Sequence, residues 1–156
     1  MKLDEAEKIA TEIGVKLMPY CSRLEVAGSI RRQKPEVNDI DIVLTPRDAW
    51  NLESVIADLA RPGLRKNGDE YKMFIYKGVQ IDLYFATDVS WSTKLLIRTG
   101  SKENNIRLAT TAKRKGWHLY ANGNGLFDNR GIRVAGDSEE SIYAALGLPY
   151  QKPEQR

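Results

Sequence analysis

Two carboxylates interrupt the most apolar strand pattern in this chain. In the segment NDIDIVL, the alternation of residue types predicts a buried strand over Ile40–Leu44. Asp39 and Asp41 are two residues apart, so both side chains point to the same face of that strand. Two carboxylates held so close are costly to bury and to ionise unless a cation lies between them. The pattern therefore predicts a cation site on one face of a sheet.

A third carboxylate interrupts a later apolar run. Asp82 lies in VQIDLYF, which predicts a strand over Val79–Phe85 beside the first one. Hard oxygen ligands of this kind suit Mg²⁺, with Mn²⁺ as a substitute, and such ions take their other ligands from phosphates. Three carboxylates on neighbouring strands can hold two ions about 4 Å apart for displacement at phosphorus.

The residues before the pair suit a phosphate. Gly28 and Ser29 allow close approach of the backbone and supply donors, and arginine is a natural partner of phosphate oxygens. If this stretch is extended, Arg31 and Arg32 point to opposite sides, so only one of them faces the site. The joint pattern, G-S-x-R-R followed by D-x-D and a third Asp, predicts nucleotidyl transfer.

The rest of the sequence predicts an α+β fold. Helices are expected over 3–17, 50–60, 90–97, 102–115 and 138–146, and strands over 24–29, 40–44, 71–76 and 79–85, with short strands after residue 117. Ser101 is the expected N-cap of one helix and Gly116 its stop. We therefore expect a mixed sheet with packed helices, followed by a small α+β lobe from about residue 89. Trp50, Trp91 and Trp117 are expected in the core.

Charge and cysteine content narrow the partners. Residues 1–93 carry a net charge of −2 and residues 94–156 a net charge of +5, so the second part suits contact with a phosphate backbone. The one cysteine, Cys21, cannot form an internal disulfide and favours a reducing cytoplasm. No signal peptide and no apolar run of about 20 residues is found, so no membrane is expected as a partner.

Four segments together resemble the family X DNA polymerases, the group that includes DNA polymerase β. They are the run Gly28–Arg32, the motif Asp39-Ile40-Asp41, the motif Thr99-Gly100-Ser101 and the ending Gly125–Tyr150, which looks like the thumb of bacterial members. The resemblance implies a nucleotidyltransferase palm over residues 1–88. It implies a thumb for nucleotide selection and DNA binding over residues 89–156.

The resemblance also implies roles for individual residues. Asp39 and Asp41 would bind two Mg²⁺ ions, and Asp82 would bind the catalytic one and help activate the primer 3′-OH. Gly100 would lie beside the nucleotide sugar, with a cis peptide to Ser101. The implied nucleotide-binding set is Gly28, Ser29, Arg32, Asn38, Arg98, Thr99, Gly100, Ser101, Lys102 and Asn105. The implied DNA-binding set is Arg107, Lys113, Arg114 and Lys115.

Two departures from the family pattern bear on selectivity. Ile97-Arg98 stands where vertebrate members carry Tyr-Phe, which predicts weak discrimination against ribonucleotides. Ala109 stands where the family carries a template-contacting arginine, which predicts low fidelity. No segment for a lyase domain or a phosphoesterase domain is found, so we expect a compact form similar to the viral members.

The expected function is template-directed addition of dNTPs to a primer 3′-OH, in short-gap filling during DNA repair. Expected partners are gapped or primer–template DNA and a dNTP, with the protein a monomer. His118 is expected to have no part in the reaction. Three alternatives stay open. The first is a nucleotidyltransferase that acts on a non-DNA acceptor, namely a small molecule, a protein or an RNA 3′ end. The second is a template-independent terminal transferase, and the third is a module that binds gapped DNA without catalysis.

Overall fold

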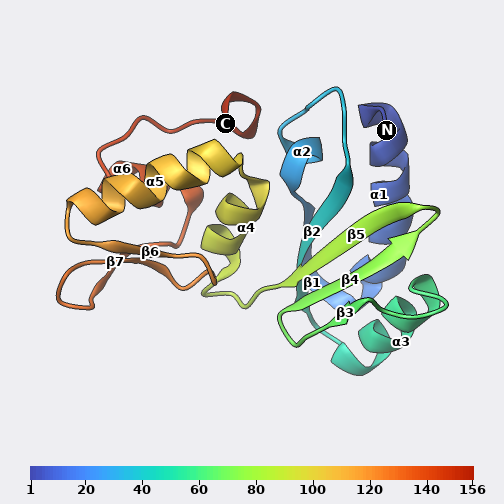
Figure 1. Cartoon of the computed structure of the whole chain (residues 1–156). Coiled ribbons are helices and arrows are strands. Elements are labelled where there is room, and N and C mark those ends of the chain that lie inside the picture. The colour runs from blue at the N-terminus through green and yellow to red at the C-terminus, as the bar shows by residue number, and fades with distance from the viewer.

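A five-stranded mixed sheet organises the first part of the chain (Figure 1). The computed structural model describes all residues, 1–156. The spatial order of the strands is β1 (Cys21–Val26), β2 (Asp39–Pro46), β5 (Val79–Phe85), β4 (Tyr71–Tyr76) and β3 (Lys66–Asn67). Strands β2 and β5 are parallel, and the other neighbours are antiparallel. The predicted mixed sheet is confirmed.

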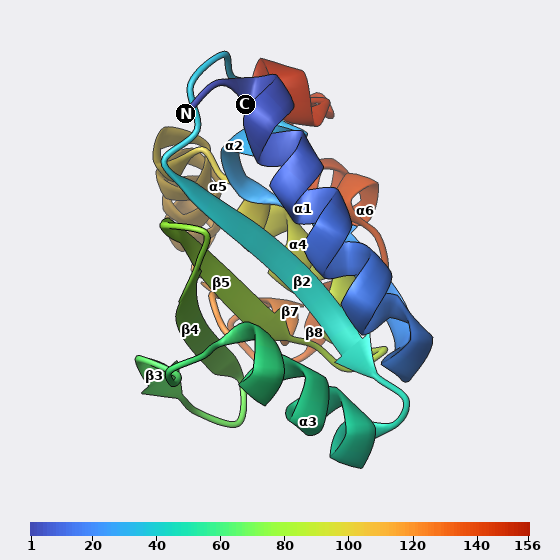
Figure 2. The ribbon, with the colours of Figure 1, turned by 90° about the vertical axis from the view of Figure 1, so that its right-hand side faces the viewer.

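Two helices cover one face of this sheet, α1 (Leu3–Leu17) and α3 (Ala49–Leu59) (Figure 2). The alternation in β2 sends Ile40, Ile42 and Leu44 toward them, and all three are fully buried. Together with residues of α1 and α3 they belong to a cluster of 17 buried hydrophobic residues. Burial of this apolar area is the main stabilising contribution to the sheet, and it fixes which face is left for Asp39 and Asp41.

The opposite face of the sheet is covered at one end by α4 (Trp91–Thr99). Ala27, Val43 and Ala86 pack there against Trp91 and Leu95 in a cluster of five buried residues. The sequence places the palm–thumb boundary between residues 88 and 89, and residues from both sides of it pack together in this cluster. The boundary itself stays a prediction. The other end of this face carries Asp39 and Asp41.

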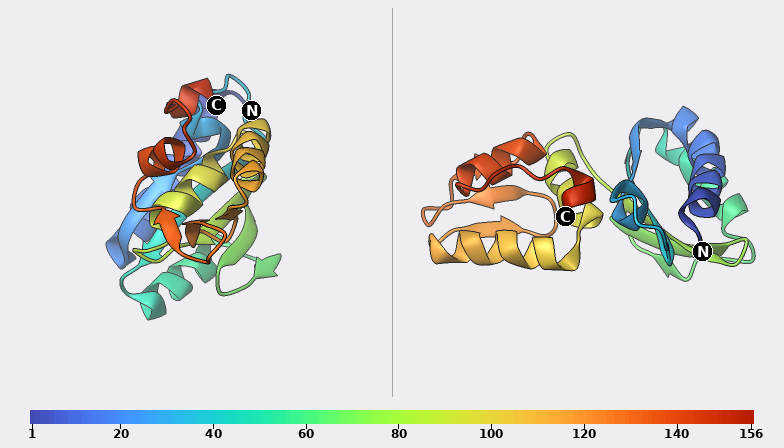
Figure 3. Two further views of the ribbon diagram at one scale, coloured as in Figure 1. Left: turned by 90° about the vertical axis from the view of Figure 1, so that its left-hand side faces the viewer. Right: turned by 90° about the horizontal axis from the view of Figure 1, so that it is seen from above.

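A second lobe follows α4. It consists of α5 (Lys102–Arg114), a three-stranded antiparallel sheet of β6 (His118–Tyr120), β7 (Gly125–Phe127) and β8 (Arg133–Ala135), and α6 (Glu139–Ala145). Nine buried residues between Leu96 and Leu146 form its core. Figure 3 shows the two lobes side by side, with the C-terminal segment, which contains the 3₁₀ turn η2 (Pro153–Gln155), between them.

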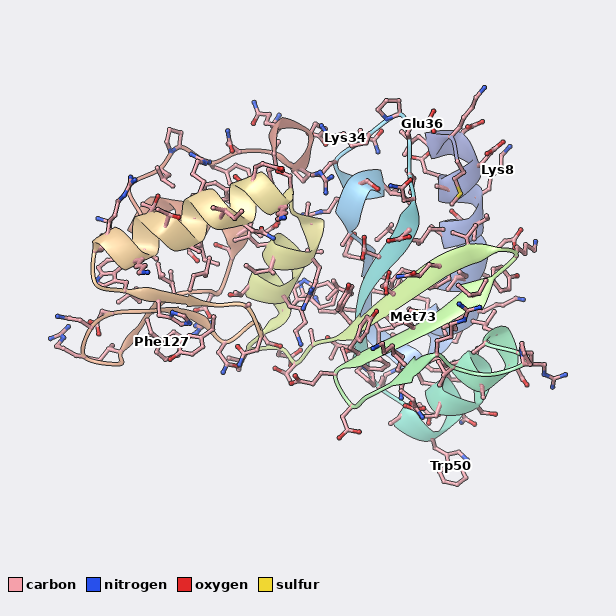
Figure 4. All side chains as sticks on the ribbon, in the orientation of Figure 1. Lys8, Lys34, Glu36, Trp50, Met73 and Phe127 are labelled. Atoms are coloured by element: carbon pink, nitrogen blue, oxygen red, sulfur yellow. The ribbon has the colours of Figure 1, made fainter.

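Most predicted elements are present, and two predictions are wrong. The strand expected over 24–29 ends at Val26, and Gly28–Arg31 forms a short helix, α2. Trp50 is 87% exposed at the start of α3, where Figure 4 shows it projecting from the protein, whereas Trp91 is buried as predicted. A short 3₁₀ turn, η1 (Met18–Tyr20), joins α1 to β1. No helix is both long and apolar enough to cross a membrane.

Candidate active site

A cavity of about 760 Å³ lies where the carboxylate-bearing end of the sheet faces α4 and α5. Its lining comes from α2, the loop before β2, β2, β5, α4 and α5. Nine of the ten predicted nucleotide-binding residues line it: Gly28, Ser29, Arg32, Asn38, Arg98, Thr99, Gly100, Lys102 and Asn105. Segments separated by about seventy residues in the sequence therefore form one cavity.

Position 28 has room only for a glycine, because its backbone lies against the Asp41 carboxylate. A Cβ atom on Gly28 would lie 2.1 Å from Oδ2 of Asp41, and the glycine φ of +57° is in the left-handed region. Only glycine accepts both conditions without strain. The chain turns here into α2, so the backbone of the Gly-Ser pair passes directly over the carboxylate.

The turn into α2 separates the two arginines. Arg31 leaves the cavity and donates to Oγ1 of Thr99 and to both carboxylate oxygens of Glu139, each at 2.8 Å. Arg32 lines the cavity, where its Nη1 donates to the carbonyl of Thr99 at 2.6 Å and its Nε is buried without a partner. The expectation that one arginine faces the site holds, but the cause is a helical turn and not an extended strand.

Asp39 and Asp41 both line the cavity, as predicted. Burial raises the pKa of Asp41 to about 7, with further contributions from the charges of Asp82 and Asp39, against a smaller lowering by Arg98. The pKa of Asp39 is raised by burial and by Asp82. Burial and the mutual repulsion of the carboxylates together disfavour the charged form of both groups.

Asp82 is paired with Asp41 across β2 and β5 but does not line the cavity. The Asp82 side chain is 4% exposed, and its Oδ1 accepts a hydrogen bond from Tyr71 Oη at 2.5 Å. Gln80 Nε2 donates to Oδ2 at 3.0 Å and to Oδ1 at 3.2 Å. No three Asp, Glu, His or Cys side chains lie close enough together to hold a metal ion in this conformation. The predicted three-carboxylate cluster is therefore present in the register of the strands but not in the orientation of the side chains.

The residues present nevertheless fit a divalent cation. Asp39 and Asp41 supply hard oxygen donors at the wall of the cavity, and the Asp41 carboxylate lies directly against Gly28, where a Cβ would clash with it. The pKa of Asp41 is raised by burial first and by the charges of Asp82 and Asp39 second, and a bound cation would oppose both effects. Oxygen donors of this kind suit Mg²⁺ or Mn²⁺ in preference to softer metals.

The end of α4 and the start of α5 form the opposite wall. The peptide between Gly100 and Ser101 is cis, as the resemblance implies. The Ser101 hydroxyl accepts from the amide of Asn104 at 3.2 Å, which confirms the predicted N-cap, and Ser101 is the one predicted nucleotide ligand that does not line the cavity. Asn105 Nδ2 donates to the Ile97 carbonyl at 2.8 Å, and its Oδ1 is buried without a partner.

Sequence reasoning missed several residues of the cavity wall. Tyr84 lies two residues after Asp82 on β5, and the strand period alone would have placed it on the same face. The guanidinium of Arg98 lies 4.2 Å from the centroid of the Tyr84 ring. Lys34 and Glu36 also line the cavity, from the loop between α2 and β2 that is labelled in Figure 4. Apart from their charged side chains, nothing in the sequence indicated that these two residues would lie at the cavity.

The predicted DNA-binding residues lie on the second lobe, outside the cavity. Lys113, Arg114 and Lys115 are exposed at the C-terminal end of α5 and its cap. Arg107 Nη2 donates to Asn104 Oδ1 at 3.3 Å and to Gln151 Oε1 at 2.8 Å, so part of its donor capacity is used within the protein. The structure therefore separates Arg107 from the cluster of three.

Comparisons with known proteins agree with this geometry. Residues 94–156 match the family model for the DNA polymerase beta thumb. DNA polymerase/3′-5′ exonuclease PolX of Bacillus subtilis is 28% identical over 97% of this chain, which spans 27% of that protein. Repair DNA polymerase X of African swine fever virus (isolate Tick/Malawi/Lil 20-1/1983) is 27% identical over 96% of this chain, which spans 90% of that protein.

The fold has a counterpart among solved structures. The crystal structure of Leishmania infantum polymerase beta in a ternary P/T complex superposes with a TM-score of 0.79 at 21% identity, and the match covers 100% of this chain and 76% of that one. The mixed α+β architecture predicted from the sequence is thereby confirmed. The similarity runs through both lobes, and it includes the strands that carry Asp39, Asp41 and Asp82. In its thumb, its sequence relatives and its fold, the chain is similar to the family X DNA polymerases.

Proposed function

We propose that this chain is a DNA-directed DNA polymerase that transfers a nucleotide from a dNTP to a primer 3′-OH with the help of two divalent cations. The observation that carries the proposal is the single cavity that unites the carboxylates of β2 with Arg32, Arg98 and Lys102. One wall carries carboxylates and the other carries basic side chains. This arrangement suits a triphosphate whose charge is shared between metal ions and guanidinium groups. The relatives named DNA polymerases supply the reaction class.

Each wall of the cavity has a role in the proposed reaction. The cations would neutralise charge on the triphosphate and on the attacking and leaving oxygens. Asp39, Asp41 and Asp82 would hold them, and the Asp82 carboxylate would also accept a hydrogen bond from the primer 3′-OH and so help to activate it. Ser29 and Arg32 would hold the triphosphate. Because phosphoryl transfer requires little covalent chemistry from the protein, positioning and electrostatic stabilisation would account for most of the rate.

The α4–α5 wall would select the nucleotide. Gly100 has no side chain and lies next to Arg32, so a sugar can approach the backbone there. Asn105 Oδ1 is a buried acceptor without a partner and would accept from the incoming nucleotide or from a water it holds. Ile97 and Arg98 line the same wall and present one aliphatic and one charged side chain to the sugar. This composition supports the expectation of weak discrimination against ribonucleotides.

Gap filling in DNA repair is the proposed context. The positively charged second lobe would contact the duplex through phosphates, without reading its sequence. Ala109 is exposed on α5, one turn after Asn105, and offers a template base no hydrogen bond, which supports low fidelity. Template-independent addition, or transfer to a non-DNA acceptor, would use the same carboxylates.

The decisive experiment is extension of a 5′-labelled primer on a one-nucleotide gapped duplex, with Mg²⁺ or Mn²⁺, by wild type and by Asp41→Ala. Template-matched addition that is lost in the variant and in EDTA is expected. Addition without regard to the template base would favour terminal transfer. If wild type extends no gapped, nicked or single-stranded primer with either metal ion, the polymerase proposal is wrong and a non-DNA acceptor takes its place.

A further inference from the structure

Asp82 is turned toward a tyrosine that the reaction proposed above does not use. Its Oδ1 receives hydrogen bonds from Tyr71 at 2.5 Å and from Gln80 at 3.2 Å, and its Oδ2 receives one from Gln80 at 3.0 Å. Both oxygens of the carboxylate therefore have protein donors. Asp39 and Asp41 face the cavity, whereas Asp82 is 4% exposed and does not line it.

The sheet register explains why Tyr71 reaches this carboxylate. On β4, Met73 lies opposite Asp82 and Tyr71 lies opposite Tyr84, so the Tyr71 side chain reaches Asp82 diagonally on the same face. Burial raises the pKa of the Tyr71 hydroxyl to about 12, helped by its hydrogen bond to Asp82.

A stack of three side chains fixes the position of the Tyr71 ring. The ring lies on that of Tyr84, with centroids 5.2 Å apart and planes 26° from parallel. The guanidinium of Arg98 lies on Tyr84, 4.2 Å from the ring centroid. Stacked and cation–π contacts of this geometry are attractive. The stack joins α4 to the strand that carries Asp82.

We propose that Tyr71 is a positioning residue that, with Gln80, holds Asp82 in a retracted orientation, so that the cation site is incomplete until a substrate is bound. For Asp82 to join Asp39 and Asp41 around a cation, its carboxylate has to turn to the cavity and give up the Tyr71 hydrogen bond. The proposal rests on the proposed function, because it concerns the third ligand of the same site.

The structure also supplies a means of release. Arg98 lines the cavity, and its Nε is buried without a hydrogen-bond partner. A nucleotide triphosphate in the cavity competes with the Tyr84 ring for the Arg98 guanidinium, because a charge-assisted hydrogen bond is stronger than a cation–π contact. Movement of Arg98 removes one layer of the stack and loosens the ring that holds Asp82.

Tyr71 could instead support Asp82 in its metal-binding orientation, and that role predicts the opposite change in metal affinity when the hydroxyl is removed. A donor that supports a ligand carboxylate in its binding orientation increases metal affinity, and its removal weakens binding. A donor that holds the carboxylate away competes with the metal ion, and its removal strengthens binding. Tyr71→Phe keeps the ring and the stack and removes only the hydroxyl, so it separates the two roles.

The test is a titration of the full chain with Mn²⁺ in the absence of DNA. Electron paramagnetic resonance measures the free ion and so gives the Kd. Wild type, Tyr71→Phe and Asp82→Asn are compared, with Tyr76→Phe as the matched control. Tyr76 lies on the same strand and donates to Glu12 at 3.1 Å, away from the cavity. Tyr71→Phe is expected to lower the Kd for Mn²⁺ by about 3- to 10-fold, the worth of one hydrogen bond. Tyr76→Phe is expected to leave the Kd unchanged.

The gain has to depend on Asp82. Adding Asp82→Asn to Tyr71→Phe is expected to abolish the tighter binding, and primer extension by Tyr71→Phe is expected to saturate at lower Mg²⁺. An unchanged or raised Kd in Tyr71→Phe would overturn the retracted-orientation proposal even if wild type extends primers. Failure of wild type to extend any primer overturns the proposed function instead, and the Mn²⁺ measurement does not depend on that result.

Discussion

The guanidinium of Arg31 is paired with the carboxylate of Glu139 through two parallel hydrogen bonds, each 2.8 Å long. Arg31 belongs to α2 beside the carboxylates, and Glu139 begins α6 of the second lobe. Arg156, whose side chain has no exposed area, donates to the same carboxylate at 3.0 Å. One buried acid thus joins helix α2, the second lobe and the C-terminal segment.

Loss of this acid is expected to destabilise the protein strongly. Glu139→Gln leaves two arginines without their counter-charge, one of them fully buried, and breaking a buried pair in this way costs about 3 kcal/mol. Urea denaturation of the variant and of Glu12→Gln provides the measurement. Glu12 pairs with Lys77 on the exposed surface, so its loss is expected to change the free energy of unfolding little. Equal effects of the two variants would contradict the assignment.

The same acid predicts a pH dependence. Burial acts to raise the pKa of Glu139, but hydrogen bonds and charges from Arg31 and Arg156 hold it below its usual value of 4.5. A depressed folded-state pKa contributes stability above the unfolded-state pKa, and this stability is lost as the pH falls through the folded-state value. The stability difference between wild type and Glu139→Gln is therefore expected to be largest near neutral pH and to shrink below pH 4.5.

In metal-free protein, the stability contribution of Asp41 is expected to fall as the pH rises, which is the opposite of the trend for Glu139. Burial raises its pKa from 3.8 to about 7, so the folded state keeps a proton that the unfolded state has lost between these values. Stability from this group is present below pH 3.8 and is lost as the pH rises to about 7. Thermal unfolding in EDTA is expected to show wild type losing stability relative to Asp41→Asn over this window. Mg²⁺ is expected to reduce the loss, and a pH-independent difference would contradict the shift.

Gly28→Ala is expected to damage the site more than the fold. The new Cβ would have to share space with Oδ2 of Asp41, at 2.1 Å, so the carboxylate has to move. A displacement of about 1 Å in such a group costs about a hundredfold in rate. Single-turnover primer extension measures the effect. Gly63→Ala is the control, because its Cβ would meet no atom within 4 Å and is expected to change nothing.

Arg114 tests the proposed duplex contact by its salt dependence. If its exposed guanidinium neutralises one DNA phosphate, Arg114→Gln is expected to reduce the slope of log K against log salt by about 0.9. Fluorescence anisotropy with a labelled gapped duplex at several salt concentrations gives the slope. Arg61→Gln, an equally exposed change on the other lobe, is expected to keep the wild-type slope. A similar loss in both would mean that only net charge matters.

The local sequence determined much of the fold and the composition of the site. Apolar alternation in DIDIVL predicted that β2 buries Ile40, Ile42 and Leu44 on one side and presents Asp39 and Asp41 on the other, because a strand has a strict period of two. Helical spacing predicted α1, and a serine before Lys102 predicted the cap of α5. These features depend on neighbours in the sequence, so no tertiary contact was needed to infer them.

The tertiary structure decided what depends on distant parts of the chain. Gly28–Arg31 turns into a helix because Ala27 is anchored to β2 and Arg31 finds its partner in Glu139, more than a hundred residues away. The orientation of Asp82 depends on Tyr71, which only the pairing of β4 with β5 brings within 2.5 Å. Residue types can show which side chains a site requires. Rotamers and partners across the fold are chosen by the lowest total energy of packing and hydrogen bonding, which no local pattern contains.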